Sequence, residues 1–150
     1  MNVERHQAVI IGGGPAGLAA AIQLKQKGID DVVVLEREHR TGGILRQCIH
    51  DGFGLTRFGE TLSGPEYAQR FVDRAEELGV TCLTDTTALS LDANRTITAS
   101  GPAGLKKLQG DAVILTMGCR ERTRGAIAIP GSRPAGIYTA GVAQEYINLR

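Results

Sequence analysis

A glycine motif between an apolar run and a helical stretch constrains the fold of this chain most strongly. Gly12, Gly14 and Gly17 have the spacing G-x-G-x-x-G and follow the apolar run 7–11. A continuous apolar run of this length is typical of a strand that is buried on both faces. Pro15 suits the first turn of a helix, because that position needs no N–H donor. The order strand, glycine turn and helix is the context in which this spacing predicts a dinucleotide-binding turn.

The segment after the motif completes a strand–helix–strand unit. Apolar residues continue the helix to about Lys27, and Gly28 is expected to end it. The run 32–35 is a second buried strand. A unit of this kind is right-handed and its strands are parallel, so the fold class is α/β.

Each motif glycine has a separate physical task. The first permits the tight turn, the second lets the backbone approach a pyrophosphate, and the third lets helix and strand pack closely. The start of the helix offers free N–H groups and partial positive charge to phosphate oxygens. Glu36, at the end of the second strand, is placed to accept hydrogen bonds from a ribose. Arg37 is within reach of a 2′-phosphate, but Glu36 would repel one, so we interpret Arg37 as solvated. The loop alone does not separate FAD from NAD.

The middle of the chain combines a long loop with a well-marked helix. Residues 38–63 show no clean period and contain several glycines, and a loop this long in a compact domain is usually functional. Ser63 and Glu66 have capping-box spacing, which predicts a helix start. Tyr67 and Phe71 lie on one face of that helix, together with later apolar residues, and Gly79 ends it.

The second half of the chain is predominantly β. We expect a short strand at 80–83, in which Cys82 is inert core. Three antiparallel strands should form a meander, at 86–91, 96–100 and 105–108. A last buried strand is predicted at 111–115, and an irregular stretch then leads to a short helix at 142–149.

Composition narrows the function classes. Glycine makes up 20 of 150 residues, and the formal net charge is +1. The near-neutral charge argues against a nucleic-acid or polybasic membrane binder. The apolar stretch 8–22 is shorter than the ~18–20 residues that span a bilayer. Three cysteines are an odd count at wide spacing, which favours a reducing, cytoplasmic compartment.

Further motifs carry a resemblance to a known family. The glycine turn, Glu36, the pair Gly42-Gly43 and the stretch 115–118 are spaced as in the FAD domains of pyridine nucleotide-disulfide oxidoreductases. The segment 79–92 is also similar to that family. The runs 118–122 and 133–141 resemble one branch, the FAD-binding chains of sarcosine oxidase, opine oxidase and hydrogen cyanide synthase.

The resemblance implies a fold, a cofactor and a domain organisation. It implies a Rossmann-like FAD-binding domain, with a parallel sheet, helices and a three-stranded antiparallel β-meander. Residues 1–150 would be its N-terminal portion, with an NAD(P)-binding domain and a C-terminal FAD segment outside this chain. The family's second glycine-rich motif and paired cysteines have no counterpart in the sequence.

The resemblance also assigns cofactor contacts position by position. The pyrophosphate would lie against the first glycine loop, the ribose on Glu36, the adenine near Ala88, and the flavin near 44–50 and the end of the last strand. The expected cofactor-binding residues are Gly12, Gly14, Pro15, Ala16, Gly17, Glu36, Arg37, Gly42, Gly43, Ile44, Leu45, Arg46, Gln47, Ala88, Thr116, Met117, Gly118 and Arg120. The family often has Ala-Thr-Gly where this chain has Thr116-Met117-Gly118, so the chain departs from the family's threonine contact there.

The sequence pattern assigns no catalytic residue. Cys48 and His50 are weak candidates near the flavin, and no second ligand pair accompanies them, so no metal site is expected. Arg122 and Arg124 are interpreted as solvated residues with Glu121 as partner.

The expected function is the FAD-binding part of a flavoprotein oxidoreductase. Its flavin would take electrons from NAD(P)H or from an amine or hydroxy-acid substrate and pass them to an acceptor. The alternatives are a single-domain NAD(P)-dependent dehydrogenase and a non-catalytic FAD-binding subunit of a complex. The expected partners are a small-molecule substrate or electron acceptor, and a partner subunit or a second copy of the chain.

Overall fold

A six-stranded sheet with helices on one side forms the body of the molecule. The computed structural model describes residues 2–132 and 134–149. The strand order is β5-β2-β1-β8-β7-β6, with the first four strands parallel and the last two antiparallel to their neighbours. The strands of this sheet are β1 (Val3–Ile11), β2 (Val32–Leu35), β5 (Thr81–Leu83), β6 (Thr87–Leu91), β7 (Thr96–Gly101) and β8 (Gly104–Leu115). The α/β fold class expected from the sequence is therefore confirmed.

The first strand–helix–strand unit forms as its sequence predicts. Helix α1 (Pro15–Gln26) begins with a proline in its first turn, and Gly28, at φ +83°, follows its end. β1 pairs in parallel with β2, so that Ala8 lies opposite Val32 and Ile11 lies opposite Leu35. The glycine turn between β1 and α1 is thereby placed at the carboxyl edge of the sheet.

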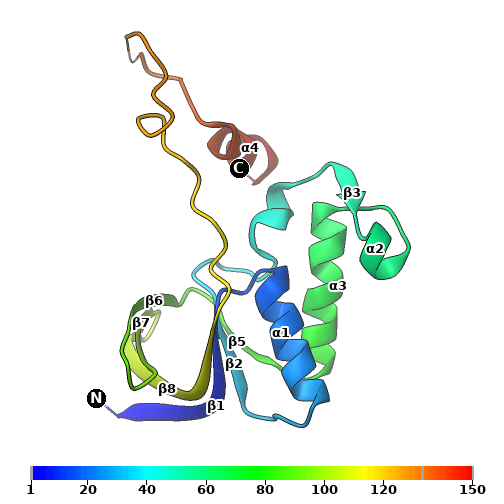
Figure 1. Cartoon of the computed structure of the whole chain (residues 1–150), viewed down its shortest axis with the longest axis vertical. Helices are drawn as coiled ribbons and strands as arrows, with labels where there is room; N and C mark the ends of the chain where they lie inside the picture. The colour runs from blue at the N-terminus through cyan, green and yellow to red at the C-terminus, as the bar shows by residue number, and fades with distance from the viewer. Residues whose placement is uncertain (1, 133, 150) are drawn as a thin grey trace.

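Each face of the sheet is covered by a different layer. On one face, α1 covers Ala8, Ile10 and their neighbours on β2, and α3 (Gly64–Glu77) packs against α1, Val80 and Cys82. On the other face, Val9 and Ile11 pack with the meander residues Ile97, Ala99 and Leu108. Figure 1 shows the two helices on one side of the sheet and the curled meander on the other.

The structure has one continuous strand where the sequence predicted two separate strands. The runs 105–108 and 111–115 are halves of the single strand β8, which pairs with β1 from Val3↔Lys107 to Ile11↔Leu115. The predicted first strand accordingly begins earlier, at Val3 rather than near Gln7. The polar halves of the two strands pair with each other, and an apolar pattern does not reveal that pairing.

The carboxyl end of β8 is less buried than we predicted. Leu115 is 54% exposed, because it lies on the same face of β8 as Val113, the meander face, and β7 pairs only with residues 104–109. The prediction of a fully buried last strand is therefore wrong for this chain.

Small elements organise the long loop between β2 and α3. These are a 3-10 helix η1 (Gly43–Gln47), β3 (Asp51–Phe53), α2 (Leu55–Phe58) and β4 (Leu62–Ser63). β3 and β4 form a two-stranded antiparallel sheet. The capping box at Ser63 and Glu66 is present, as the sequence predicts. Phe71 is buried and Tyr67 packs against the same cluster.

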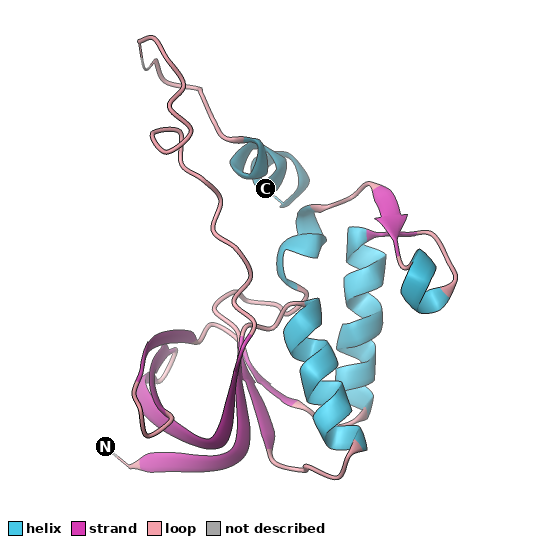
Figure 2. Cartoon of the chain, in the orientation of Figure 1, coloured by secondary structure: helices cyan, strands magenta, loops and turns pink. Residues whose placement is uncertain are grey.

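The chain leaves the sheet after β8 and contacts the η1 segment again through a C-terminal helix. Figure 2 shows residues after 115 as a long loop that leads to α4 (Ala140–Leu149). The Gln47 side chain donates hydrogen bonds to Gly141 O (3.3 Å) and Gln144 Oε1 (3.2 Å), and Asn148 Nδ2 donates to Gln47 O (2.6 Å). These contacts attach α4 to η1. None of the helices in the described part of the chain has the length and apolarity needed to cross a bilayer.

Candidate functional site: a dinucleotide cradle

The glycine turn and the start of α1 form one wall of the candidate site. Gly14 is the N-cap of α1, and no side chain caps this helix. The first N–H groups of a helix have no partner within it, so they are free to bind an anion here. An added Cβ at Gly17 would overlap the carbonyl oxygen of Gly12 and approach Thr116 Oγ1 to 2.8 Å. The third glycine therefore allows the turn, the helix and the end of β8 to pack together.

The pair Gly42-Gly43 forms the opposite wall of the candidate site. Gly42 N donates to Gly13 O at 2.8 Å, which joins the two glycine loops. A Cβ added to Gly43 would lie 2.9 Å from Gly14 Cα, while a Cβ on Gly14 would have only Gly43 Cα near it, at 3.8 Å. Gly14 and Gly43 are therefore in direct backbone contact: a side chain on Gly43 would force the two loops apart, whereas a Cβ on Gly14 would make only an ordinary contact.

Two backbone N–H groups hold the side chain of Glu36 beside the glycine turn. Its carboxylate accepts hydrogen bonds from Gly13 N (2.8 Å) and Glu38 N (2.9 Å), and the residue is 6% exposed. Its own N–H donates to Leu83 O, and its carbonyl accepts from Thr86 N. A carboxylate has about four lone-pair sites, so acceptor capacity remains for two hydroxyl groups. Sequence reasoning missed Gly13 as the residue that orients Glu36, although it is the middle glycine of a run of three.

The end of β8 completes the cradle. Thr116 N donates to Ile11 O, and Thr116 Oγ1 lies within hydrogen-bond distance of both Ile11 O (3.0 Å) and Gly12 O (2.9 Å). The threonine side chain is thus committed to the glycine turn. The backbone at Thr116 lies directly against Gly12, where an added Cβ would overlap Thr116 O, whereas the Met117 side chain is 65% exposed.

The structure brings most of the predicted cofactor residues to one edge of the sheet. Ala88 is on β6, two residues after Thr86, which bonds to the Glu36 carbonyl. The expected residues near the glycine loops and Glu36 are Gly12, Gly14, Pro15, Ala16, Gly17, Gly42, Gly43, Thr116, Met117 and Gly118. Ile44, Leu45, Arg46 and Gln47 form the adjoining η1.

Several predicted side chains have other surroundings. Arg37 is exposed and pairs with Glu38 Oε1 at 3.3 Å, which fits a solvated arginine. Gln47 uses its amide on α4. Glu121 accepts from Gly141 N (2.6 Å) and Arg124 donates to Ser132 O (3.1 Å), so the predicted pairing of Glu121 with the arginines is wrong.

The weak catalytic candidates lie beyond η1. Cys48 Sγ is 3.5 Å from Ile44 O, and the exposed His50 ring lies 5.3 Å from the Phe53 ring. Arg120 is exposed in the loop after Gly118. Arg133, part of a motif that supports the family resemblance, lies outside the described residues. No group of three or more His, Cys, Asp or Glu residues in the described part of the chain is arranged to hold a metal ion.

Sequence comparison relates the chain to subunits of known oxidases. It is 30% identical to one of the opine oxidase subunits of Agrobacterium tumefaciens, over 93% of this chain and 28% of that protein. It is 27% identical to hydrogen cyanide synthase subunit HcnB of Pseudomonas protegens, over 93% of this chain and 29% of that protein. The alpha subunit of sarcosine oxidase from a Corynebacterium species is 30% identical over 98% of this chain and 16% of that protein. The chain spans less than a third of each of these relatives.

Solved structures share the fold. L-Proline dehydrogenase from P. horikoshii aligns with a TM-score of 0.73 at 22% identity, over 99% of this chain and 30% of that one. Thioredoxin reductase of Lactococcus lactis aligns with a TM-score of 0.64 at 24% identity, over 84% of this chain and 39% of that one. The family model described as pyridine nucleotide-disulphide oxidoreductase matches residues 6–147. The chain therefore belongs to the pyridine nucleotide-disulphide oxidoreductase family.

Proposed function

We propose that this chain binds the adenosine and pyrophosphate parts of FAD in the cradle between Gly14, Gly43 and Glu36. The close approach of the two glycine loops at the uncapped start of α1 carries the proposal, because the absence of side chains there leaves the backbone N–H groups accessible to a ligand. A pyrophosphate needs close approach to N–H groups, and the uncapped start of α1 supplies them. The buried carboxylate of Glu36 would hold ribose hydroxyls.

The family supports FAD as the cofactor and an oxidoreductase as the whole protein. Bound flavin would supply two-electron transfer between a reduced donor and an acceptor. The residues of this chain would orient it: the α1 terminus would neutralise phosphate charge, and Glu36 would fix the ribose. The η1 segment, from Ile44 to Gln47, would adjoin the ribityl chain and the ring system.

Donor, partners and domain organisation are part of the same proposal. Residues 1–150 would be the N-terminal portion of the FAD-binding domain, and the donor would be NAD(P)H or an amine or hydroxy-acid substrate. Three relatives are named as subunits, which supports a partner subunit for this chain. The free thiols of Cys48, Cys82 and Cys119 support a reducing compartment such as the cytoplasm.

The experiment that tests the cofactor assignment is reconstitution with FAD. The purified protein is titrated with FAD and with NAD⁺ in parallel, and flavin binding is followed by fluorescence quenching. Tight binding of FAD with weak binding of NAD⁺ is expected. Binding of NAD⁺ without FAD would overturn the proposal in favour of a nicotinamide dehydrogenase.

Glu36→Gln and Glu38→Gln form a matched pair for the ribose site. Glu38 is the next acid along the chain, and its side chain is 60% exposed. Glu36→Gln should weaken FAD binding, and Glu38→Gln should leave it unchanged. NADH, NADPH and amine or hydroxy-acid donors are then added anaerobically, and bleaching of the bound flavin by any of them would exclude a non-catalytic FAD-binding subunit.

A further inference from the structure

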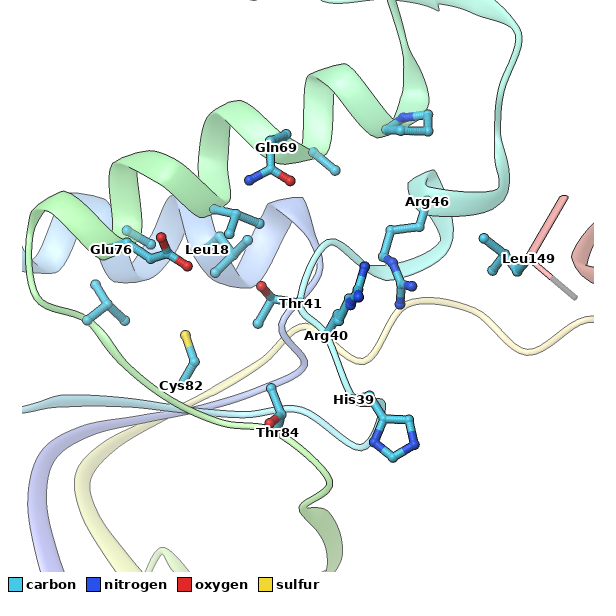
Figure 3. A pocket seen from close by; sticks show the side chains of 15 residues that line it. Leu18, His39, Arg40, Thr41, Arg46, Gln69, Glu76, Cys82, Thr84 and Leu149 are labelled. Carbon is cyan, nitrogen blue, oxygen red and sulfur yellow. The ribbon is translucent and has the colours of Figure 1, made fainter.

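A second cavity lies behind the cofactor cradle, between α3, the end of β5 and the segment 39–41. Its volume is about 670 Å³, which is within the range of small-molecule sites. Figure 3 shows the two helices above it and the strands of the sheet below. Its apolar lining is formed by Leu18, Ala68, Val72, Ala75, Val80 and Cys82.

The cavity and the cradle lie on opposite sides of the second glycine pair. A Cβ on Gly43 would point at Gly14, in the cradle. A Cβ on Gly42 would instead meet Arg46 Cγ (3.1 Å) and Ala68 Cβ (3.4 Å), and both of these residues line the cavity. The directions of these two Cβ positions therefore place the cavity on the opposite side of Gly42-Gly43 from the glycine turn.

One end of the cavity carries unpaired positive charge. Arg40 and Arg46 both line it, and within residues 2–132 and 134–149 neither guanidinium has an ion-pair or hydrogen-bond partner. Figure 3 shows both arginines at the end of the cavity remote from Cys82. His39, at the same end, is already paired with Asp85.

The other end of the cavity limits the charge of an occupant. Glu76 lines the wall near Cys82, so a second negative group placed there would be repelled. A ligand with one anionic group at the arginine end and an apolar body over the apolar lining matches both ends. Guanidinium groups bind carboxylates through paired N–H donors, and this suits a monocarboxylate.

We propose that this cavity binds a monocarboxylate with a medium-length hydrocarbon chain. The carboxylate lies against Arg40 and Arg46, and the hydrocarbon covers Val72, Val80 and Cys82. The site is additional to the FAD cradle and shares with it only Arg46, which belongs to η1.

Cys82 provides a reporter in the lining of the site. It is the one cysteine of the three in the sequence that lines the cavity, so a Cys48→Ser/Cys119→Ser variant leaves a single thiol. Burial raises the pKa of Cys82, so alkylation by N-ethylmaleimide is followed at alkaline pH by mass spectrometry. Octanoate at ten times its Kd should slow alkylation about tenfold, since only a tenth of the sites is then free. The matched uncharged probe is octanamide at the same concentration.

Three results would overturn the proposal. The first is alkylation that octanoate does not slow, and the second is equal protection by octanamide. The third is a Cys82 that reacts after denaturation but not in the ligand-free native protein. That result would mean that another part of the protein covers the cavity.

Two variants test the two ends of the site independently. Arg40→Gln should abolish the preference for octanoate over octanamide, whereas Arg74→Gln, on the exposed side of α3, should not. Val72→Trp should fill the cavity, so that octanoate no longer protects Cys82 from alkylation, while FAD binding persists. A preference for octanoate that persists in Arg40→Gln, or protection by octanoate that persists in Val72→Trp, would overturn the assignment. Because the alkylation assay needs no flavin, failure of FAD binding would leave this result readable.

Discussion

Replacement of Gly14 separates cofactor binding from folding more cleanly than any other change in the cradle. Its φ of −74° and ψ of 179° are extended values that every residue adopts, so a side chain adds no backbone strain. The nearest atom to an added Cβ is Gly43 Cα at 3.8 Å, an ordinary contact distance. Gly14→Ala and Gly14→Val should therefore fold.

The expected loss is in FAD affinity. Each charge-assisted hydrogen bond contributes about 1.5–3 kcal/mol, and displacing the pyrophosphate from two N–H donors removes about 3–6 kcal/mol. At about 1.4 kcal/mol per tenfold, the Kd for FAD should rise about 100- to 10,000-fold, with Val at the upper end. The free energy of unfolding should change by no more than about 1 kcal/mol, because a helix N-cap tolerates alanine at that cost.

The assay combines flavin titration with urea unfolding on the same preparations. Gly17→Ala is the control for a structural glycine, because its Cβ would overlap Gly12 O; it should lose about 1–3 kcal/mol of stability as well as cofactor. Normal FAD affinity in Gly14→Val would refute the cradle. A Gly14→Ala protein as unstable as Gly17→Ala would refute the reasoning about open space.

Three further outcomes follow from single contacts. Glu36→Gln should raise the Kd for FAD about 10- to 100-fold, measured by fluorescence titration, and an unchanged Kd would remove Glu36 from the ribose site. Ser63→Ala should cost about 1 kcal/mol in urea unfolding at neutral pH. Hydrogen bonds from Ser63 lower the pKa of Glu66 from 4.5, so the Ser63–Glu66 pair stabilises the fold above that pH and its contribution fades as the pH falls below it. A loss of stability in Ser63→Ala that grows in acid would contradict this. Gln47→Ala should release α4 from η1, seen as faster amide exchange across 140–149, whereas the exposed Gln69→Ala should not.

Local patterns predicted the elements that depend on short-range chemistry. The βαβ unit, the capping box at Ser63 and the helix at the end of the chain follow from apolar periodicity and capping residues close in sequence. Long-range pairing was less accessible. The union of 105–108 with 111–115 depends on β1, about a hundred residues earlier, whose polar half pairs with polar residues. The short elements between β2 and α3 have too few residues for a period to appear.

The candidate site divides in the same way. The G-x-G-x-x-G spacing and Glu36 by themselves predicted a tight turn, a helix start and an acid at a strand end, because these are local features. Only the tertiary structure decided what the neighbouring glycines face. A Cβ on Gly43 would face Gly14, and a Cβ on Gly42 would face Arg46 and Ala68. Two adjacent glycines therefore border two different parts of the structure. The direction of a Cα–H bond depends on the backbone fold around it, and sequence spacing carries no record of that direction.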